Sequence, residues 1–161
     1  MNQQFYALAR DLNASQLTED RHVYFGSILG TLNHIMVGDI VWLKRFAQHP
    51  VGFQSLDVVR TLETPDSLDA TLHKRLMPLS QLRSVLDETI VAFVDELDER
   101  ALSTNLNYAN FKGVQHTKPF SLLLLHFFNH QTHHRGQVSA LFSQAGLDIG
   151  VTDLLLDIPS A

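Results

Sequence analysis

A stripe of histidines near the C-terminal end of the chain has the residue type and spacing that could do chemistry. His130 and His134 are four residues apart, so at about 100° per residue they lie one above the other on one face of an α-helix. Leu123, Phe127 and Leu141 fall on the same face, and this periodicity predicts that the face points into a hydrophobic core. Two imidazoles therefore stand where a plain bundle would place leucine.

Buried imidazoles need either hydrogen-bond partners or a metal ion. Burying an unpaired polar ring costs on the order of a few kcal/mol. A divalent metal removes that cost, because neutral imidazole is a good ligand for Zn, Ni, Cu and Fe, and this spacing brings two rings to one ion. The alternative is a pair of hydrogen-bonded core or interface histidines, and the two residues alone leave both interpretations open.

A third ligand has to come from another helix, and His34 fits that requirement. It lies in the middle of a helical segment, on a face with Thr31, Gly38 and Val41. Small residues beside a histidine leave space for an open coordination position, although glycine within a helix costs about 1 kcal/mol relative to alanine. A close helix crossing at Gly30 and Gly38 explains the small residues equally well.

Four further residues are candidates for the surroundings of the metal. His126 extends the stripe by one turn and could shuttle protons, but a hydrogen-bonded core histidine is the favoured interpretation. Gln137 could orient a ligand or pair with a neighbouring helix. Asp39 could support His34 from five residues further on, but a surface or capping carboxylate is the favoured interpretation. Tyr108 is a pocket candidate.

Other kinds of site are excluded or disfavoured. The chain has no cysteine, which excludes disulfides, thiolate ligands and a cysteine nucleophile. The segment 130–134 has zincin spacing without the general-base glutamate, and the paired Glu-x-x-His motifs of di-iron bundles are absent. The remaining histidines are predicted to be solvated: His22, His49, His73 and His116.

Length and composition describe an ordinary globular domain. The chain has 161 residues, 45% of them hydrophobic and 18% charged, which is enough for one domain with a real core. Its net charge is −5 and its 12 Lys and Arg are scattered, so nucleic-acid binding is disfavoured. No segment has the pattern of a signal peptide or a membrane span, and we expect a cytoplasmic protein without membrane association.

The elements that must position the histidines are predicted to be helices. Apolar residues recur at three- and four-residue intervals in a short segment and three long ones, 1–12, 24–48, 67–97 and 120–144. Pro78 is a candidate for a kink within the third of these segments.

The remaining segments complete the predicted architecture. Residues 105–119 are polar and predict a short hairpin, and 151–158 predict a short terminal helix or turn. The pattern therefore indicates an all-α four-helix bundle with a short additional C-terminal element, in a single domain over residues 1–161. The run 120–128 is apolar nearly all round, which indicates burial in the core or against a partner, and we expect a homodimer.

The sequence resembles the DinB family of bacterial bundle proteins, the DinB/YfiT-like metal-binding superfamily. Residues 32–43 read LNHIMVGDIVWL, similar to the family pattern LxHxxxxDxxWL. Residues 129–137 read NHQTHHRGQ, similar to the family pattern NHxTxHRGQ. Weaker similarity near Tyr108 and at 152–155 extends the match over nearly the whole chain.

This resemblance implies a fold and a site. The implied fold is an up-down-down-up four-helix bundle, often dimeric. The implied site is one divalent ion per chain, usually Zn or Ni, held by three histidines of the second and fourth helices, which match His34, His130 and His134. Characterised members include enzymes that use a low-molecular-weight thiol such as bacillithiol or mycothiol, so such a thiol is an implied co-substrate.

Two hypotheses from different classes follow. The first is a metal-dependent enzyme, either a thiol-dependent S-transferase or a small-molecule hydrolase, because an open three-histidine ion can lower the pKa of bound water or activate a thiolate. The second is a non-catalytic, stress-associated bundle whose metal is structural or vestigial and which acts as a binding or dimerisation module. A fourth protein ligand would favour the second hypothesis, since structural zinc usually has four.

Overall fold

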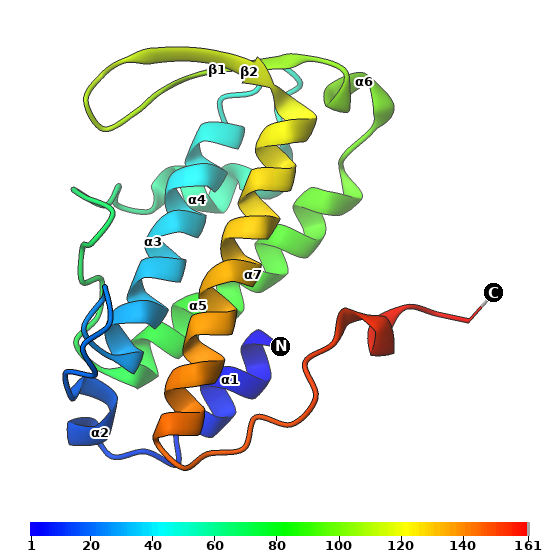
Figure 1. The fold of residues 1–161 in the computed structure, drawn as a ribbon. Helices are drawn as coiled ribbons and strands as arrows, with labels where there is room; N and C mark the ends of the chain where they lie inside the picture. The colour runs from blue at the N-terminus through cyan, green and yellow to red at the C-terminus, as the bar shows by residue number, and fades with distance from the viewer. Residues whose placement is uncertain (161) are drawn as a thin grey trace.

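Four principal helices pack side by side in the computed structural model, which describes residues 1–160. They are α1 (Asn2–Ala9), α3 (Ile28–Phe46), α5 (Leu76–Asp95) and α7 (Phe120–Gln144). In Figure 1, α3 and α5 run in one direction while α1 and α7 run in the other. This is the up-down-down-up order that the resemblance implied.

Short helical turns lie between the principal helices and after the last of them. They are α2 (Ala14–Thr18), η1 (Gln54–Leu56), α4 (Asp57–Thr61), α6 (Glu99–Leu102) and η2 (Leu154–Asp157). The predicted helical segment 1–12 ends earlier than expected, and α2 begins after a capping box in which the side chain and backbone of Asn13 pair with those of Gln16. No helix within residues 1–160 is both long and apolar enough to cross a membrane.

The start of α3 is fixed by its cap. The hydroxyl of Ser27 accepts a hydrogen bond from the backbone N–H of Gly30, 3.0 Å away, and the helix begins at Ile28 instead of near Tyr24. A Cβ on Gly30 would clash with the carbonyl oxygen of Phe25, so glycine allows the preceding loop to fold closely over the first turn. Nearly all of α3 is buried, and it is the central helix.

The predicted helix 67–97 is wrong over its first nine residues, because α5 begins only at Leu76. The backbone of the preceding loop is instead bonded to α3. Asn33 exchanges two hydrogen bonds of 3.0 Å with the backbone of His73. Pro78 lies in the first turn of α5, where no N–H is needed, and so it marks the start of the helix instead of kinking it.

The predicted hairpin is confirmed and leads directly into α7. Strands β1 (Asn105–Ala109) and β2 (Gln115–Pro119) pair antiparallel, with Asn105 opposite Pro119. The helix α7 then spans Phe120–Gln144, as the sequence predicted, and packs along α3. The pairing of α3 with α7 positions the histidines.

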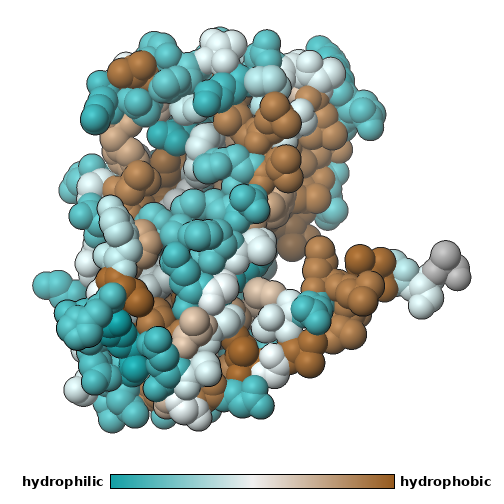
Figure 2. All heavy atoms as spheres, viewed as in Figure 1, coloured by the Kyte–Doolittle hydropathy of each residue, from teal (hydrophilic) through white to brown (hydrophobic). Residues whose placement is uncertain are grey.

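The core is rich in phenylalanine, and its six fully buried rings are Phe5, Phe46, Phe93, Phe120, Phe127 and Phe142. One side of α7 nevertheless faces solvent, with exposed large residues at Leu122, Leu125 and Phe128. After α7 the chain first stays against the bundle, where Leu147 and Ile149 pack on the core. It then leaves the bundle, and η2 is an exposed turn whose leucines are Leu154, Leu155 and Leu156 (Figures 1 and 2).

Candidate metal centre

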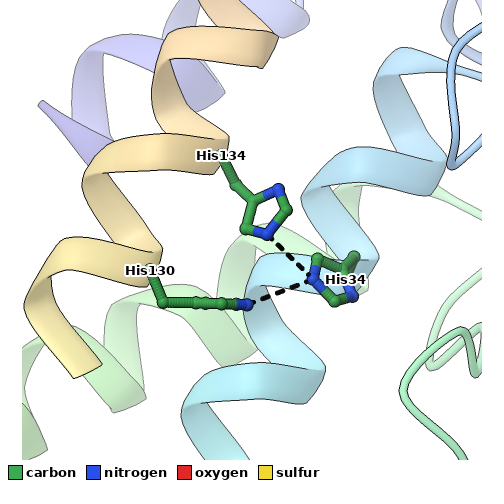
Figure 3. A group of neighbouring side chains, drawn as sticks. All are labelled: His34, His130 and His134. Atoms are coloured by element: carbon green, nitrogen blue, oxygen red, sulfur yellow. Dashed lines mark hydrogen bonds between the residues drawn. The ribbon is translucent and has the colours of Figure 1, made fainter. Parts of the chain in front are cut away.

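The pairing of α3 with α7 brings three histidine rings together (Figure 3). The Nε2 atom of His34 lies 3.1 Å from Nε2 of His134 and 3.2 Å from Nε2 of His130. One nitrogen from each ring lies within 4.8 Å of the other two. His34 and His134 are buried and His130 is half-buried.

The outer nitrogens of two rings are held by hydrogen-bond acceptors. Nδ1 of His34 lies 2.8 Å from the carbonyl oxygen of Leu68, and Nδ1 of His134 lies 2.8 Å from Oε1 of Gln137. A carbonyl oxygen can only accept, so both Nδ1 atoms carry the proton and both Nε2 atoms present lone pairs. Two lone pairs at 3.1 Å cannot bond to each other, and a cation between them satisfies both.

The spacing of these nitrogens fits a first-row metal. Metal–nitrogen bonds are about 2.0–2.1 Å long, so two ligands of a tetrahedral ion lie roughly 3.3–3.4 Å apart, and neighbouring ligands of an octahedral ion about 3 Å apart. The observed 3.1 and 3.2 Å fall between these values. The two distances from His34 therefore suit a divalent ion, and the three ligand nitrogens all lie within 4.8 Å of one another.

Burial keeps the rings neutral, which is the form that binds metals. Burial lowers the pKa of His34 and of His134, and burial together with the neighbouring imidazoles lowers the pKa of His130 to about 4. The hydrogen bonds that His34 and His134 donate to the oxygens of Leu68 and Gln137 oppose this lowering of the pKa, whereas His130 has no such opposing contribution.

Gly38 provides the space for His130. A Cβ placed on Gly38 would lie 2.7 Å from Cε1 of the His130 ring, closer than real carbon contacts allow. The space beside Gly38 is therefore filled by the ring from α7 and is no open coordination position, and the alternative of a close helix crossing is the better description of Gly38. Gly30 has a different role, since it faces the Phe25 loop.

An aromatic ring covers the group from the loop before α3. The ring of Phe25 stacks on His34 with centroids 3.8 Å apart and planes 16° apart, and it meets His134 edge-on at 5.5 Å. A cavity of about 210 Å³ adjoins His34, between this loop and residues 69–71. Phe25 thus covers one face of His34, and the cavity adjoins this ring and not His130 or His134.

The candidate surrounding residues fall into two groups. Gln137 contacts the site directly, since it accepts from His134 and its amide nitrogen lies 3.1 Å from Nε2 of the exposed His133. His126 and Tyr108 lie further along the bundle, where both pack on Trp42 at 5.0 and 5.4 Å. His126 is exposed, so its interpretation as a core histidine is wrong.

Asp39 is fully buried, so the surface or capping interpretation is wrong. Its carboxylate accepts hydrogen bonds from Arg83 of α5 and, at 2.7 Å, from Gln131 of α7. It therefore connects three helices beneath the site and makes no hydrogen bond to a histidine of the group. His49 also differs from the prediction, because it is 3% exposed and hydrogen-bonded to Thr104.

A comparison of the sequence with known protein families identifies one of them. The model of the DinB family matches residues 1–161. The chain belongs to the DinB family. This DinB-family protein is also 27% identical over 153 residues to Protein DinB of Bacillus subtilis (strain 168), an alignment that covers 94% of this chain and 84% of the relative. No solved structure matches the chain significantly.

Several contributors to the site were not predicted from the sequence. Phe25 and Leu68 come from loops, and neither has a spacing relation to the histidines that a helical pattern would show. Gln131 stands beside His130 but about 100° away from the stripe, so its partner had to come from another helix. The sequence offered no signal for Gln131, which falls at a variable position of the family pattern NHxTxHRGQ.

Proposed function

We propose that this DinB-family protein holds one divalent metal ion, Zn or Ni, on His34, His130 and His134, and uses it as an enzyme. The observation that carries this proposal is the convergence of three neutral imidazoles whose Nε2 atoms meet while two Nδ1 atoms are bound to acceptors. Imidazole nitrogens suit either metal.

The number of ligands supports a reactive site over a structural one. Within residues 1–160 the metal-ligating group consists of three histidines, and no carboxylate joins it. Structural zinc sites are usually closed by four protein ligands, whereas catalytic sites keep a position open. The half-buried His130 leaves one side of the group accessible.

The reaction we propose is S-transfer with a low-molecular-weight thiol, with hydrolysis of a small molecule as the alternative. When bound, the ion would supply a Lewis acid that makes a thiol or a water molecule more acidic. The side chains of the protein would then position and enclose the reactants. Gln137 fixes the orientation of His134, and Phe25 shields the rings from bulk water.

Cobalt substitution distinguishes these possibilities, because Co²⁺ reports its ligands by its absorption spectrum. Metal-depleted protein would be loaded with Co²⁺ and titrated with bacillithiol, and with its S-methyl derivative as a control. S-transfer predicts a sulfur-to-cobalt charge-transfer band that the S-methyl derivative does not produce. A thiol that leaves the spectrum unchanged would contradict S-transfer, and ester hydrolysis by the loaded protein would then support the alternative.

We further propose that the protein is a homodimer, and the exposed apolar side of α7 supports this. Leu122 and Leu125 are 59% and 65% exposed in the single chain, and Phe128 continues the same side of the helix. Neighbouring apolar residues of this size on a helix surface indicate a partner.

A further inference from the structure

A second cavity, distant from the histidines, lies beneath the β1–β2 hairpin. It has a volume of about 510 Å³, within the usual size range of small-molecule sites. The C-terminal turns of α3, the helix α4 and the hairpin form its walls, and Figure 2 shows the surface hollowed below the overhanging hairpin.

The lining of this cavity is basic in a protein with net charge −5. Lys44, Arg45 and Arg60 all line it, and none of the described lining residues is acidic. Asp57 partly offsets Arg60 at 3.4 Å, but Lys44 and Arg45 have no carboxylate partner among residues 1–160. A concave surface with three cations concentrates anions.

Arg45 is held in a way that leaves its donors free. Its guanidinium lies over the ring of Trp42 at 4.7 Å and over that of Tyr108 at 5.0 Å. Neither contact is a hydrogen bond or an ion pair, so the N–H groups of the guanidinium remain available for a planar or tetrahedral oxyanion. Burial lowers the pKa of Arg45, and a bound anion would compensate that loss of hydration.

The uncharged residues of the lining indicate what the rest of the ligand, beyond its anionic group, should be like. Val41 and the 44% exposed ring of Phe111 supply apolar contacts, and the side chains of Gln48 and Thr64 supply polar ones. We propose that this cavity binds a small organic anion, with a carboxylate or phosphate group on the three cations and an apolar body against Phe111.

The proposal is independent of the metal site. Arg45 lies on the same face of α3 as His34 but eleven residues further on, roughly 16 Å along the helix axis. Binding of an anion should therefore be unchanged in protein treated with a chelator. Failure of metal binding and failure of anion binding can thus be recognised separately.

Fluorescence gives a direct test, because Trp42 is the single tryptophan of the chain and lies against Arg45. The probes are benzoate and phenyl phosphate, with neutral benzyl alcohol as the matched control. We expect a saturable change for at least one anion, at concentrations at least about tenfold lower than for benzyl alcohol. If only one of the two anions saturates, that result identifies the oxyanion. Equal binding of benzyl alcohol, or no saturation with either anion, would overturn the proposal.

Charge-removing variants locate the site. Lys44→Gln and Arg60→Gln should each weaken anion binding by about three- to tenfold, with melting curves close to wild type. Arg100→Gln, on the exposed helix α6 outside the cavity, removes the same charge and should change nothing. An equal loss in Arg100→Gln would show that overall charge alone attracts the probe. Anion-induced changes of amide chemical shifts confined to residues away from the hairpin, the end of α3 and the segment 60–64 would likewise contradict the site.

Discussion

At the scale of single residues, the histidine group depends on what holds each ring. His34 is fixed by a backbone carbonyl of the 67–75 loop, and His134 by Gln137, one turn away. His130 has no such acceptor and is placed instead by the space above Gly38. The spacing of the histidines was readable from the sequence, but the carbonyl of Leu68 was not, because any residue type can supply a backbone oxygen.

Gly38→Ala should displace the His130 ring and weaken metal binding. The added methyl would lie 2.7 Å from Cε1, so we expect an affinity loss of about ten- to a hundredfold, similar to the loss of an outer-shell partner. A chelator competition assay measures this. Gly136→Ala on α7 is the matched control, because a Cβ at this position would meet nothing within 4 Å. The metal affinity of this variant should be unchanged. Equal affinities for both variants would contradict this role of Gly38.

The lowered histidine pKa values predict how the stability of the metal-free protein depends on pH. The pKa of His130 is about 4 in the folded protein, against about 6.5 in an unfolded chain, so the unfolded state binds more protons between these values. The free energy of unfolding should therefore fall as the pH is lowered from about 6.5 to about 4. Urea titrations at several pH values measure it, and His130→Gln should show a weaker dependence. If the free energies of unfolding of the wild type and His130→Gln differed by the same amount at every pH in this range, a neutral buried His130 ring would be contradicted.

At the scale of elements, three helices meet at one buried carboxylate. Asp39 of α3 accepts hydrogen bonds from Arg83 of α5 and from Gln131 of α7. Gln131 follows His130 directly in the sequence. The sequence predicted α7 with its observed bounds because its pattern is long and its ends are marked by Pro119 and Gly146. It did not predict the loop 67–75, since Leu68 and Leu72 keep a helical spacing while the backbone around them bonds to α3.

Asp39→Asn should destabilise the fold, because it leaves the buried Arg83 without its counter-charge on α3. Breaking a buried pair in this way typically costs about 3–5 kcal/mol, here reduced by the second contact of Arg83 with Asp87 at 2.9 Å. Urea unfolding of metal-free protein measures the loss. The double variant Asp39→Asn with Arg83→Met should recover part of it, and a loss below about 0.5 kcal/mol in the single variant would show that the pair is not important.

At the scale of the whole molecule, the hydrophobic surfaces outside the core are the unexplained feature. The bundle and its topology were predictable, because four amphipathic segments joined by short connections have few ways to pack. A short terminal helix or turn was predicted for residues 151–158, but the exposure of their leucines in the single chain was not predictable, because a leucine-rich spacing does not say where a segment packs.

Size-exclusion chromatography with light scattering tests the proposed homodimer. We expect about twice the mass of one chain at micromolar concentration, because burial of Leu122 and Leu125 removes apolar surface from water. Leu125→Lys should shift the protein toward the single-chain mass, whereas Val91→Lys, an equally exposed site on α5, serves as the control. A single-chain mass for the wild type would refute the dimer.

The metal content of the purified, untagged protein tests the central claim most directly. After incubation with Zn²⁺ or Ni²⁺ at mildly alkaline pH and removal of free ions, elemental mass spectrometry should find about one ion per chain in the wild type. His130→Ala should lose it, and His126→Ala, which alters an exposed histidine one turn away, should keep it. A wild type without metal, or a His130→Ala variant that retains a full equivalent, would contradict the assignment of His34, His130 and His134 as a metal centre.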